Sequence, residues 1–422
     1  MTTRRTVLRL AGAAPAVALM SACRSGSSPA PAANADLPRE LLAVETGSGL
    51  TLVNTHGGPP AMGARQCVVA SDATALASGR ASAAGTLVEV RRPNGQMSFD
   101  LTVRGQLAPR VVASGGQFVA LATGPAGGDV AYRPVGREKT TIVIADHSGE
   151  RQRLELVGCV EPEAFAPGGE WLYVLDYLPP EDPERYRVRR VDLASGAYGA
   201  LSTRDKQLIP AGYEEEMRGE GRQAVYAGQR QFLFTLYTHQ PDHEHTRDLL
   251  AARAGKPDVH AFVHSLNTAL GFAYCIDLPA PFGNGPAQAH AIALTPSTQH
   301  PYVVDTSSGT VARLDGEQLT VIGVGNFAPN PAGDPAAAAI RNGNLYVGAG
   351  ETIHLIDIGK LTTRATWRVP AAVRGVAISL DGDRLWVGQP DAVIALDAAT
   401  GLVRAQVSVP GLTALRHVAS AA

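Results

Sequence analysis

Hydrophobic and polar positions alternate over short stretches of this chain, and these stretches recur along it. The clearest copy consists of four such runs, at residues 373–379, 384–388, 392–397 and 402–409. Tight turns at Asp381-Gly382 and Thr400-Gly401 separate neighbouring runs. Because alternation with a period of two predicts half-buried β-strands, the copy predicts a four-stranded antiparallel meander.

An Asp or Asn closes the third run of each copy and marks the repeat. The eight residues in this position are Asn54, Asn94, Asp146, Asp192, Asn267, Asp315, Asp357 and Asp397. Their side chains suit the position because they accept hydrogen bonds from the turn that follows. Apart from one interval of 75 residues, the spacing is 40 to 52 residues, which is typical of β-propeller blades. The sequence therefore predicts an all-β fold, a β-propeller of four-stranded antiparallel blades, with seven or eight blades and the repeat count favouring eight.

The two ends of the repeat region are expected to complete one blade together. The first unit starts at residues 41–46 and lacks a strand, whereas residues 412–419 follow the last complete unit. We expect these N- and C-terminal strands to pair and to close the ring. Closure removes open sheet edges that would pair between molecules, so we expect a monomer. The predicted domain is a single propeller over residues 39–422, with an insertion around 238–258.

Three copies resemble the YVTN-type β-propeller repeat, in which an SPDG-x-x-LYV segment precedes an apolar strand ending in Asp-x-x-x-Gly. The matching segments are residues 166–174, 340–347 and 380–387. The resemblance covers most of residues 40–419. It implies the fold but not a function, since propellers include binding proteins, lactonases, lyases and quinoprotein dehydrogenases.

The N-terminal residues form a signal peptide pattern. Arg4 and Arg5 give a positive start, and the apolar run at residues 10–20 is too short to cross a hydrocarbon core of roughly 30 Å. The start resembles the twin-arginine export motif of bacteria, with Val7 in place of the usual Phe. The end, Leu-Met-Ser-Ala before Cys23, resembles a bacterial lipobox.

These resemblances imply that residues 1–22 are removed and that a lipid is attached to Cys23. Residues 23–38 are rich in small residues and proline, which is typical of a flexible tether. The implied protein is a lipoprotein anchored in the bacterial cell membrane on its extracytoplasmic face, periplasmic or at the cell surface. An anchor with several acyl chains keeps a protein at the membrane, whereas a single acyl chain binds the membrane only reversibly. The alternative is an ordinary secreted protein with a chance cysteine.

The charge of the chain argues against one class of partner, and its cysteine content limits disulfides and metal motifs. Removal of residues 1–22 takes away three arginines and no acidic residue, which shifts the formal net charge from −2 to −5. A mildly acidic chain without basic patches argues against binding nucleic acid. Beyond Cys23, the three cysteines Cys67, Cys159 and Cys275 allow at most one intramolecular disulfide, and their spacing matches no common metal motif.

The 75-residue interval between Asp192 and Asn267 exceeds a blade by roughly thirty residues. Long insertions on a rigid scaffold often carry function. This one contains His239, His243 and His245, with acidic residues between them, followed by a helix-like stretch. Imidazole and carboxylate groups together suit zinc, copper or another divalent metal as a cofactor. The alternative is a solvated polar loop without a metal.

Three further histidines are candidates for lining a mouth of the ring. His260 and His264 are four residues apart on an expected strand and so project to the same side. His290 follows a loop rich in glycine and proline at the start of the next strand. Packing between blades is the alternative role for the first two.

The acidic run at residues 214–216 is interpreted either as a calcium site or as a charged segment.

No catalytic residues are predicted, because Gly-x-Ser-x-Gly, His-Glu-x-x-His and phosphate-loop motifs are absent from the sequence. The leading hypothesis is a non-catalytic envelope lipoprotein whose propeller binds a partner protein, a glycan or a small-molecule ligand. The alternative is an extracytoplasmic enzyme or metal-dependent factor of the lyase, lactonase or dehydrogenase type that uses the histidine-rich insertion.

Overall fold

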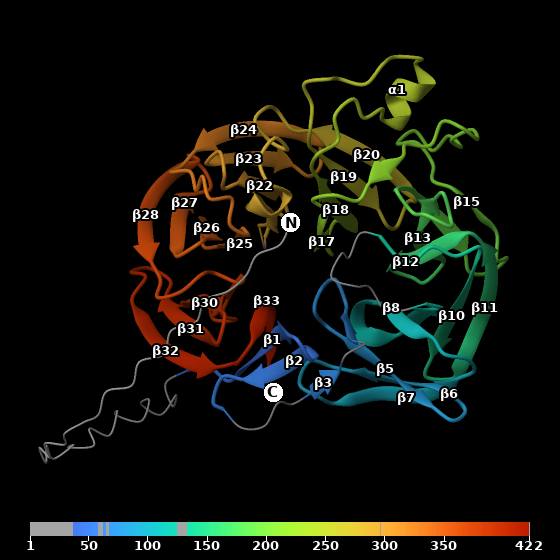
Figure 1. Cartoon of the computed structure of the whole chain (residues 1–422), viewed down its shortest axis with the longest axis horizontal. Coiled ribbons are helices and arrows are strands. Elements are labelled where there is room, and N and C mark those ends of the chain that lie inside the picture. The colour runs from blue at the N-terminus through green and yellow to red at the C-terminus, as the bar shows by residue number, and fades with distance from the viewer. Residues whose placement is uncertain (1–36, 58–61, 65–66, 125–132, 296, 422) are drawn as a thin grey trace, which may run out of the picture. The chain divides into compact units, whose positions relative to one another are not determined.

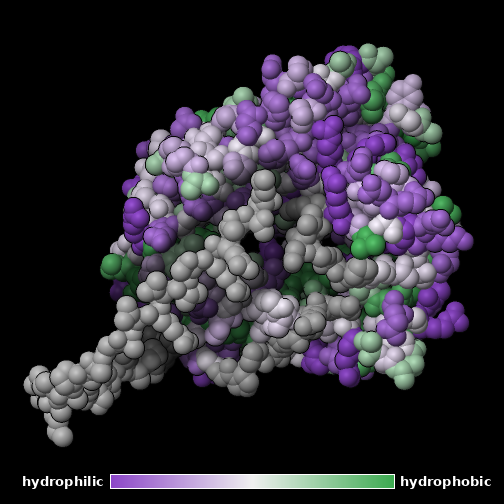
Figure 2. Space-filling view, viewed as in Figure 1, coloured by the Kyte–Doolittle hydropathy of each residue, from purple (hydrophilic) through white to green (hydrophobic). Residues whose placement is uncertain are grey.

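The computed structural model describes residues 37–57, 62–64, 67–124, 133–295 and 297–421. Eight antiparallel sheets are arranged around a ring (Figure 1). The predicted β-propeller of four-stranded blades is confirmed, with eight blades rather than seven. In the view of Figure 2, hydrophilic residues dominate the outer rim and hydrophobic residues are scattered over it.

The blades are numbered here in chain order, each from its first to its last strand. Blade 1 contains β33 (Leu412–Ser420), β1 (Glu40–Thr46), β2 (Gly49–Asn54) and β3 (Met62–Ala64). Blade 2 contains β4 (Cys67–Val69), β5 (Leu76–Ser82), β6 (Gly85–Arg91) and β7 (Met97–Val103). Blade 3 contains β8 (Ala108–Val112), β9 (Val119–Ala122), β10 (Lys139–Asp146) and β11 (Gly149–Val157). Blade 4 contains β12 (Cys159–Phe165), β13 (Trp171–Leu178), β14 (Arg185–Asp192) and β15 (Tyr198–Ala200), with β16 (Met217–Arg218) also paired to β14.

The second half of the ring repeats the same order. Blade 5 contains β17 (Gln223–Ala227), β18 (Phe232–Tyr237), β19 (Phe262–Asn267) and β20 (Phe272–Asp277). Blade 6 contains β21 (His290–Leu294), β22 (Pro301–Asp305), β23 (Thr310–Asp315) and β24 (Thr320–Asn326). Blade 7 contains β25 (Ala337–Arg341), β26 (Asn344–Ala349), β27 (Thr352–Asp357) and β28 (Thr362–Arg368). Blade 8 contains β29 (Val376–Ile378), β30 (Arg384–Gln389), β31 (Ala392–Asp397) and β32 (Val403–Ser408).

The core lies between neighbouring sheets. The middle strands of a blade are covered on both faces, so β31 is buried at its first five positions, whereas the outer strand β24 alternates between half-buried and exposed side chains. Phe234 and Val263 of blade 5, for example, belong to the same apolar cluster as Val303 of blade 6. Each blade thus depends on its neighbours to bury its apolar faces.

The residues that mark the repeat cap the turns, as predicted. In each of the eight, the side-chain oxygen accepts a hydrogen bond from the backbone N–H two residues later, at 2.7–3.2 Å. Seven of them end the third strand of their blade, and Asn94 lies in the turn just after β6. These bonds satisfy turn amides that the ladder leaves unpaired.

The predicted ring closure is confirmed. Strand β33 pairs with β1 in antiparallel orientation, with Val418 opposite Leu42. Glu40 extends the junction to blade 8, because its buried carboxylate accepts hydrogen bonds from the Leu380 amide at 2.5 Å and from the Trp386 indole N–H at 2.7 Å. One carboxylate therefore joins the first strand of the chain to the last complete blade.

The few helical segments are short. In the part of the chain that the structure describes, they are α1 (Thr246–Leu250) and two single-turn 3₁₀ segments at Ser114–Gly116 and Ala287–Ala289. Within the described ranges, no helix combines the length and the hydropathy needed to span a membrane.

We predict that Glu40→Ala lowers the free energy of unfolding by about 1–3 kcal/mol, because it leaves the buried indole N–H of Trp386 without its acceptor. The measurement is urea denaturation followed by tryptophan fluorescence. The matched control is Glu45→Ala on the same strand, which removes an exposed ion pair with Arg416 and is expected to change the free energy by less than about 0.5 kcal/mol. Equal losses in both variants would contradict this role of Glu40.

Candidate metal centre

Two extra segments lie beside blades 4 and 5, where the sequence predicted an insertion. One, residues 201–216, follows β15, and the other, residues 238–261, joins β18 to β19 and contains α1. In Figure 1, α1 lies outside the ring, beyond β19 and β20. The long interval is thus shared between two blades. It places added chain at the outer rim and not at a mouth of the central channel.

Glu215, in the first of these segments, is the residue on which the site converges. Its side chain is 11% exposed. The neighbouring acids point elsewhere: Glu214 pairs with Arg189 at 2.5 Å, and Glu216 pairs with Arg185 at 2.5 Å. The three carboxylates do not converge, so the arrangement does not support the calcium interpretation of this acidic run.

His243 and His245 bring two imidazoles from the insertion to Glu215. Nδ1 of His245 lies 3.3 Å from Oε2 of Glu215, and Nε2 of His243 lies 3.9 Å from the same oxygen. Both rings pack on Phe262, His243 by stacking at 4.5 Å and His245 edge-on at 5.0 Å between centroids. The aromatic platform fixes the orientation of both rings.

The Nε2 atom of His243 is buried and has no hydrogen-bond partner among the described residues. Its side chain is 7% exposed. A buried polar atom without a partner costs about 1–3 kcal/mol, and such atoms in native proteins often mark the position of an ion or water. This nitrogen faces the donor cluster, so it is available as a ligand.

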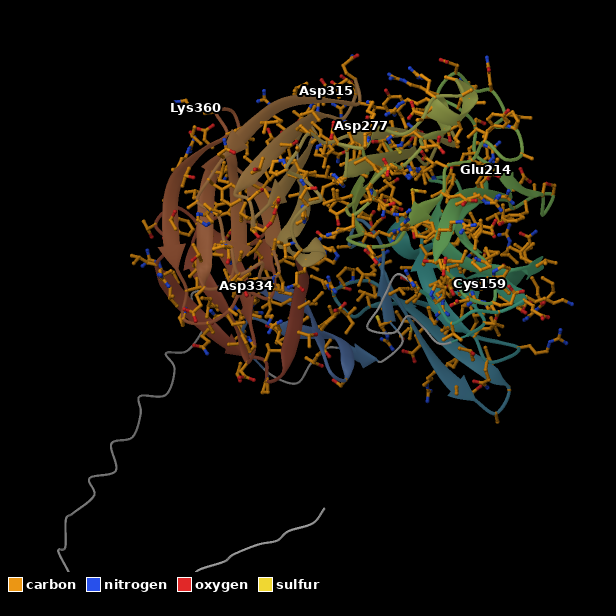
Figure 3. The ribbon with its side chains drawn as sticks, turned by 45° about the horizontal axis from the view of Figure 1, so that its top comes forward. Cys159, Glu214, Asp277, Asp315, Asp334 and Lys360 are labelled. Carbon is orange, nitrogen blue, oxygen red and sulfur yellow. The ribbon has the colours of Figure 1, made fainter. Side chains whose placement is uncertain are left out.

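Asp277, at the end of β20, orients His245 from the opposite side. Its Oδ1 accepts a hydrogen bond from Nε2 of His245 at 2.6 Å, which leaves Nδ1 free to face Glu215. Arg247 and Lys256 pair with the other oxygen, at 3.0 Å and 2.6 Å. A carboxylate that holds the second nitrogen of an imidazole is the usual support of a metal-binding histidine. Figure 3 shows Asp277 in the upper half of the ring, as it does Glu214.

His264 and Cys275 complete the cluster from the hairpin of β19 and β20. They lie directly opposite each other in the register of the two strands. Nε2 of His264 and Sγ of Cys275 each lie 3.3 Å from Oε1 of Glu215. The hairpin thus presents an imidazole and a thiol to the same carboxylate oxygen.

Two sets of three donor atoms result, and within each set all atoms lie within 4.8 Å of one another. Both sets include Glu215. The first adds His243 and His245, and the second adds His264 and Cys275. Imidazole nitrogen, carboxylate oxygen and cysteine sulfur are the donors that zinc and related ions take in proteins.

Burial and hydrogen bonding shift the protonation of these groups. Burial raises the pKa of Glu215, but the three imidazoles beside it outweigh that effect and hold its pKa well below its usual range. Burial lowers the pKa of His245, and Asp277 and Glu215 together raise it above its ordinary value. Burial, and then the charge of Glu215, raises the pKa of Cys275 well above normal. A metal ion would therefore have to displace the proton of this thiol.

A cavity of about 310 Å³ opens beside the donors. Its lining includes Glu215, His245, His264 and Cys275, together with apolar side chains such as Leu201 and Leu250. On the His243 side, a second cavity of about 300 Å³ is lined mainly by polar residues. The donors thus stand between two spaces that small solutes can occupy.

The other predicted histidines take different positions. His239 is not a donor in either set, and its Nδ1 lies 2.9 Å from the hydroxyl of its neighbour Thr238. His260 precedes β19 and is half-buried, so it does not share a strand face with His264. His290 is fully buried, and its Nε2 accepts a hydrogen bond from Gly283, which holds the glycine- and proline-rich loop before β21.

Arg4, Arg5 and Cys23 lie outside the described residues. The other three cysteines, Cys67, Cys159 and Cys275, are free thiols. The disulfide that the sequence allowed is therefore not formed among them.

Sequence reasoning did not assign Cys275 or Asp277 to a metal site, and it considered Glu215 only as part of a possible calcium site in the acidic run 214–216. One local signal could have found Cys275. The turn between residues 267 and 272 sets the hairpin register, in which His264 pairs with Cys275. The sequence contains no local signal that brings Glu215 to the histidines, because its proximity depends on how blades 4 and 5 pack.

Neither a protein-family model nor a curated protein matches this sequence. Among solved structures, apo AztD from Citrobacter koseri is similar, with a TM-score of 0.51 and 12% identity over 90% of this chain and 97% of that one. The dihydro-heme d1 dehydrogenase NirN in complex with DHE gives a TM-score of 0.53 and 12% identity over 96% of this chain and 78% of that one. At these identities the likeness shows the β-propeller fold alone.

We predict that Asp277→Asn lowers the pKa of His245 in the metal-free protein, because the amide keeps an acceptor but loses the negative charge. The ion pair stabilises the fold between the lowered pKa of Asp277 and the raised pKa of His245, and the stabilisation is lost as pH rises through the latter. The variant's loss of stability should therefore be larger at pH 6 than at pH 9, as measured by urea denaturation, with the histidine pKa read by NMR titration.

The control for this prediction is Lys256→Ala, which removes an exposed cation from the other oxygen of Asp277 and leaves the bond to His245 in place. This variant should not lower the pKa of His245. A histidine pKa unchanged by Asp277→Asn would contradict the assignment of this pair.

Proposed function

We propose that this chain is a metal-binding β-propeller that holds a divalent transition metal, with zinc as the best match, at the donor cluster around Glu215. The observation that carries the proposal is the unpartnered, buried Nε2 of His243, which faces this cluster. A metal ion would satisfy that nitrogen and the neighbouring donors at once.

The choice of zinc follows from the donor types. Calcium and magnesium prefer all-oxygen sites, whereas this cluster contains three imidazoles and a thiol around a single carboxylate. Zinc takes nitrogen, sulfur and carboxylate ligands and tolerates low coordination numbers. The support of His245 by Asp277 agrees with the same assignment, since supported imidazoles are typical of zinc sites.

The proposed role is binding rather than catalysis, in an extracytoplasmic lipoprotein exported by the twin-arginine route and built from YVTN-type repeats. The ligand that the sequence left open, whether protein, glycan or small molecule, is in this proposal first of all a metal ion. A protein retained at the membrane by Cys23 would keep bound metal at the envelope while the propeller stays free to meet partners.

An enzyme or metal-dependent factor is the second candidate. The cavity of about 310 Å³ beside Glu215, His264 and Cys275 favours it, because a catalytic metal needs space for water or substrate in an open coordination position. A binding role requires no such exchangeable position.

We predict that the protein without residues 1–22 retains zinc through dialysis, as measured by elemental analysis. His243→Ala combined with His245→Ala removes two ligands and should lower the amount of zinc retained, and Asp277→Ala should weaken binding about 10–100-fold in a chelator competition. The matched control is His239→Ala, which changes a histidine of the same insertion that is not a donor and should leave zinc affinity unchanged. Zinc-free wild-type protein, or an equal loss in the control, would overturn the proposal.

We predict that Cys23→Ala releases the protein from membranes into the soluble fraction, because the proposed lipid attachment is removed. The measurement is fractionation of cells followed by immunoblotting, with Cys67→Ala as the control that leaves Cys23 intact. Continued membrane association of the Cys23 variant would show that the anchor is not a lipid on this residue.

A further inference from the structure

The imidazoles around Glu215 are divided between its two oxygens, and the thiol of Cys275 lies slightly closer to Oε1 than to Oε2. Oε2 faces Nδ1 of His245 at 3.3 Å and Nε2 of His243 at 3.9 Å. Oε1 lies 3.3 Å from Nε2 of His264 and 3.3 Å from Sγ of Cys275, and this sulfur also lies 3.5 Å from Oε2. One carboxylate thus stands between two groups of ligands and does not belong to either alone.

We infer that the site binds two metal ions, with Glu215 as a bridging carboxylate. This inference rests on the proposed metal-binding function and specifies its stoichiometry. The first ion is held by His243, His245 and Oε2 of Glu215. The second is held by His264, Cys275 and Oε1 of Glu215.

The spacing of the donors fits two ions. Tetrahedral zinc with bonds of 2.0–2.3 Å separates its ligand atoms by roughly 3.5 Å, and each set of three already lies within 4.8 Å. Each set can therefore close around its own ion by small side-chain movements. The two sets have only Glu215 in common. Carboxylate-bridged ions in proteins lie about 3.5–4 Å apart.

The two positions differ in chemistry. The first offers two imidazoles, one of them supported by Asp277, and is a nitrogen and oxygen site. The second contains a thiol and so favours softer ions such as zinc over magnesium or manganese. When the second ion binds, the Cys275 proton leaves to solvent and the sulfur becomes a thiolate ligand.

Two divalent ions bring four positive charges, of which the ligands of this site balance two. The nearest uncommitted negative charges are Glu215 and the thiolate of Cys275, since Glu214 is paired with Arg187 and Arg189. With three protein ligands at each ion, a fourth position remains at both. The cavity beside His245, His264 and Cys275 has room for the water or anion that would fill these positions.

The test is titration of the metal-free protein with Co²⁺ alone, followed by visible absorption and by equilibrium dialysis. The wild type should bind two equivalents, and thiolate-to-cobalt charge-transfer absorption should grow with only one of them. Cys275→Ala should bind one equivalent without that absorption. The variant that combines His243→Ala with His245→Ala should bind one equivalent and retain the charge-transfer absorption. Far-UV circular dichroism of each metal-free variant checks its fold.

Because a core cysteine variant can fail to fold, a second measurement uses the unaltered chain. X-ray absorption of the protein loaded with zinc should show metal–metal scattering at about 3.5–4 Å. If the wild type binds only one equivalent of metal, and this binding requires donors from both sets, the two-ion inference is overturned and the proposed function stands. No bound metal in the wild type would overturn the proposed function itself.

Discussion

The burial of both faces of every sheet is the constraint on which this structure depends. Middle strands such as β26 and β31 are buried and largely apolar because a neighbouring blade covers each side, so each blade depends on the next for its stability. The ring must therefore close, and it does so by pairing strands from the two ends of the chain. Glu40 reinforces this junction with hydrogen bonds to Leu380 and Trp386. Blades 4 and 5, which together carry the candidate site, are held in position by the same closure.

Electrostatic burial explains why the candidate site is assembled as it is. A carboxylate in an enclosed position requires compensation, and at Glu215 the compensation comes from three imidazoles and a thiol rather than from a lysine or arginine. The nearby arginines pair with Glu214 and Asp277 instead. The result is a group of donors whose protons a metal ion can replace. This distinguishes the cluster from the ordinary ion-pair networks of the same two blades.

The sequence predicted what local chemistry determines. The Asx residues predicted the turns, and their spacing predicted the ring, because each repeat is a complete local unit. The sequence also placed His243 and His245 together, since they are two residues apart. It could not place Glu215 beside Cys275, because these residues are 60 positions apart and meet only through the packing of two blades. His239 shows the opposite limit: its backbone bends just after β18 with a left-handed φ of 58°, and although it is close to His243 in sequence it is not among the donors.

The donor segments have a consequence for how such a site can arise. Each blade has the same four-stranded framework, to which His264 and Cys275 belong, whereas Glu215, His243 and His245 lie on chain added outside it. Changes in these additions alter these three donors without altering the sheet that closes the ring. The propeller thus separates the part of the molecule that must stay constant in order to fold from the part that is free to acquire new chemistry.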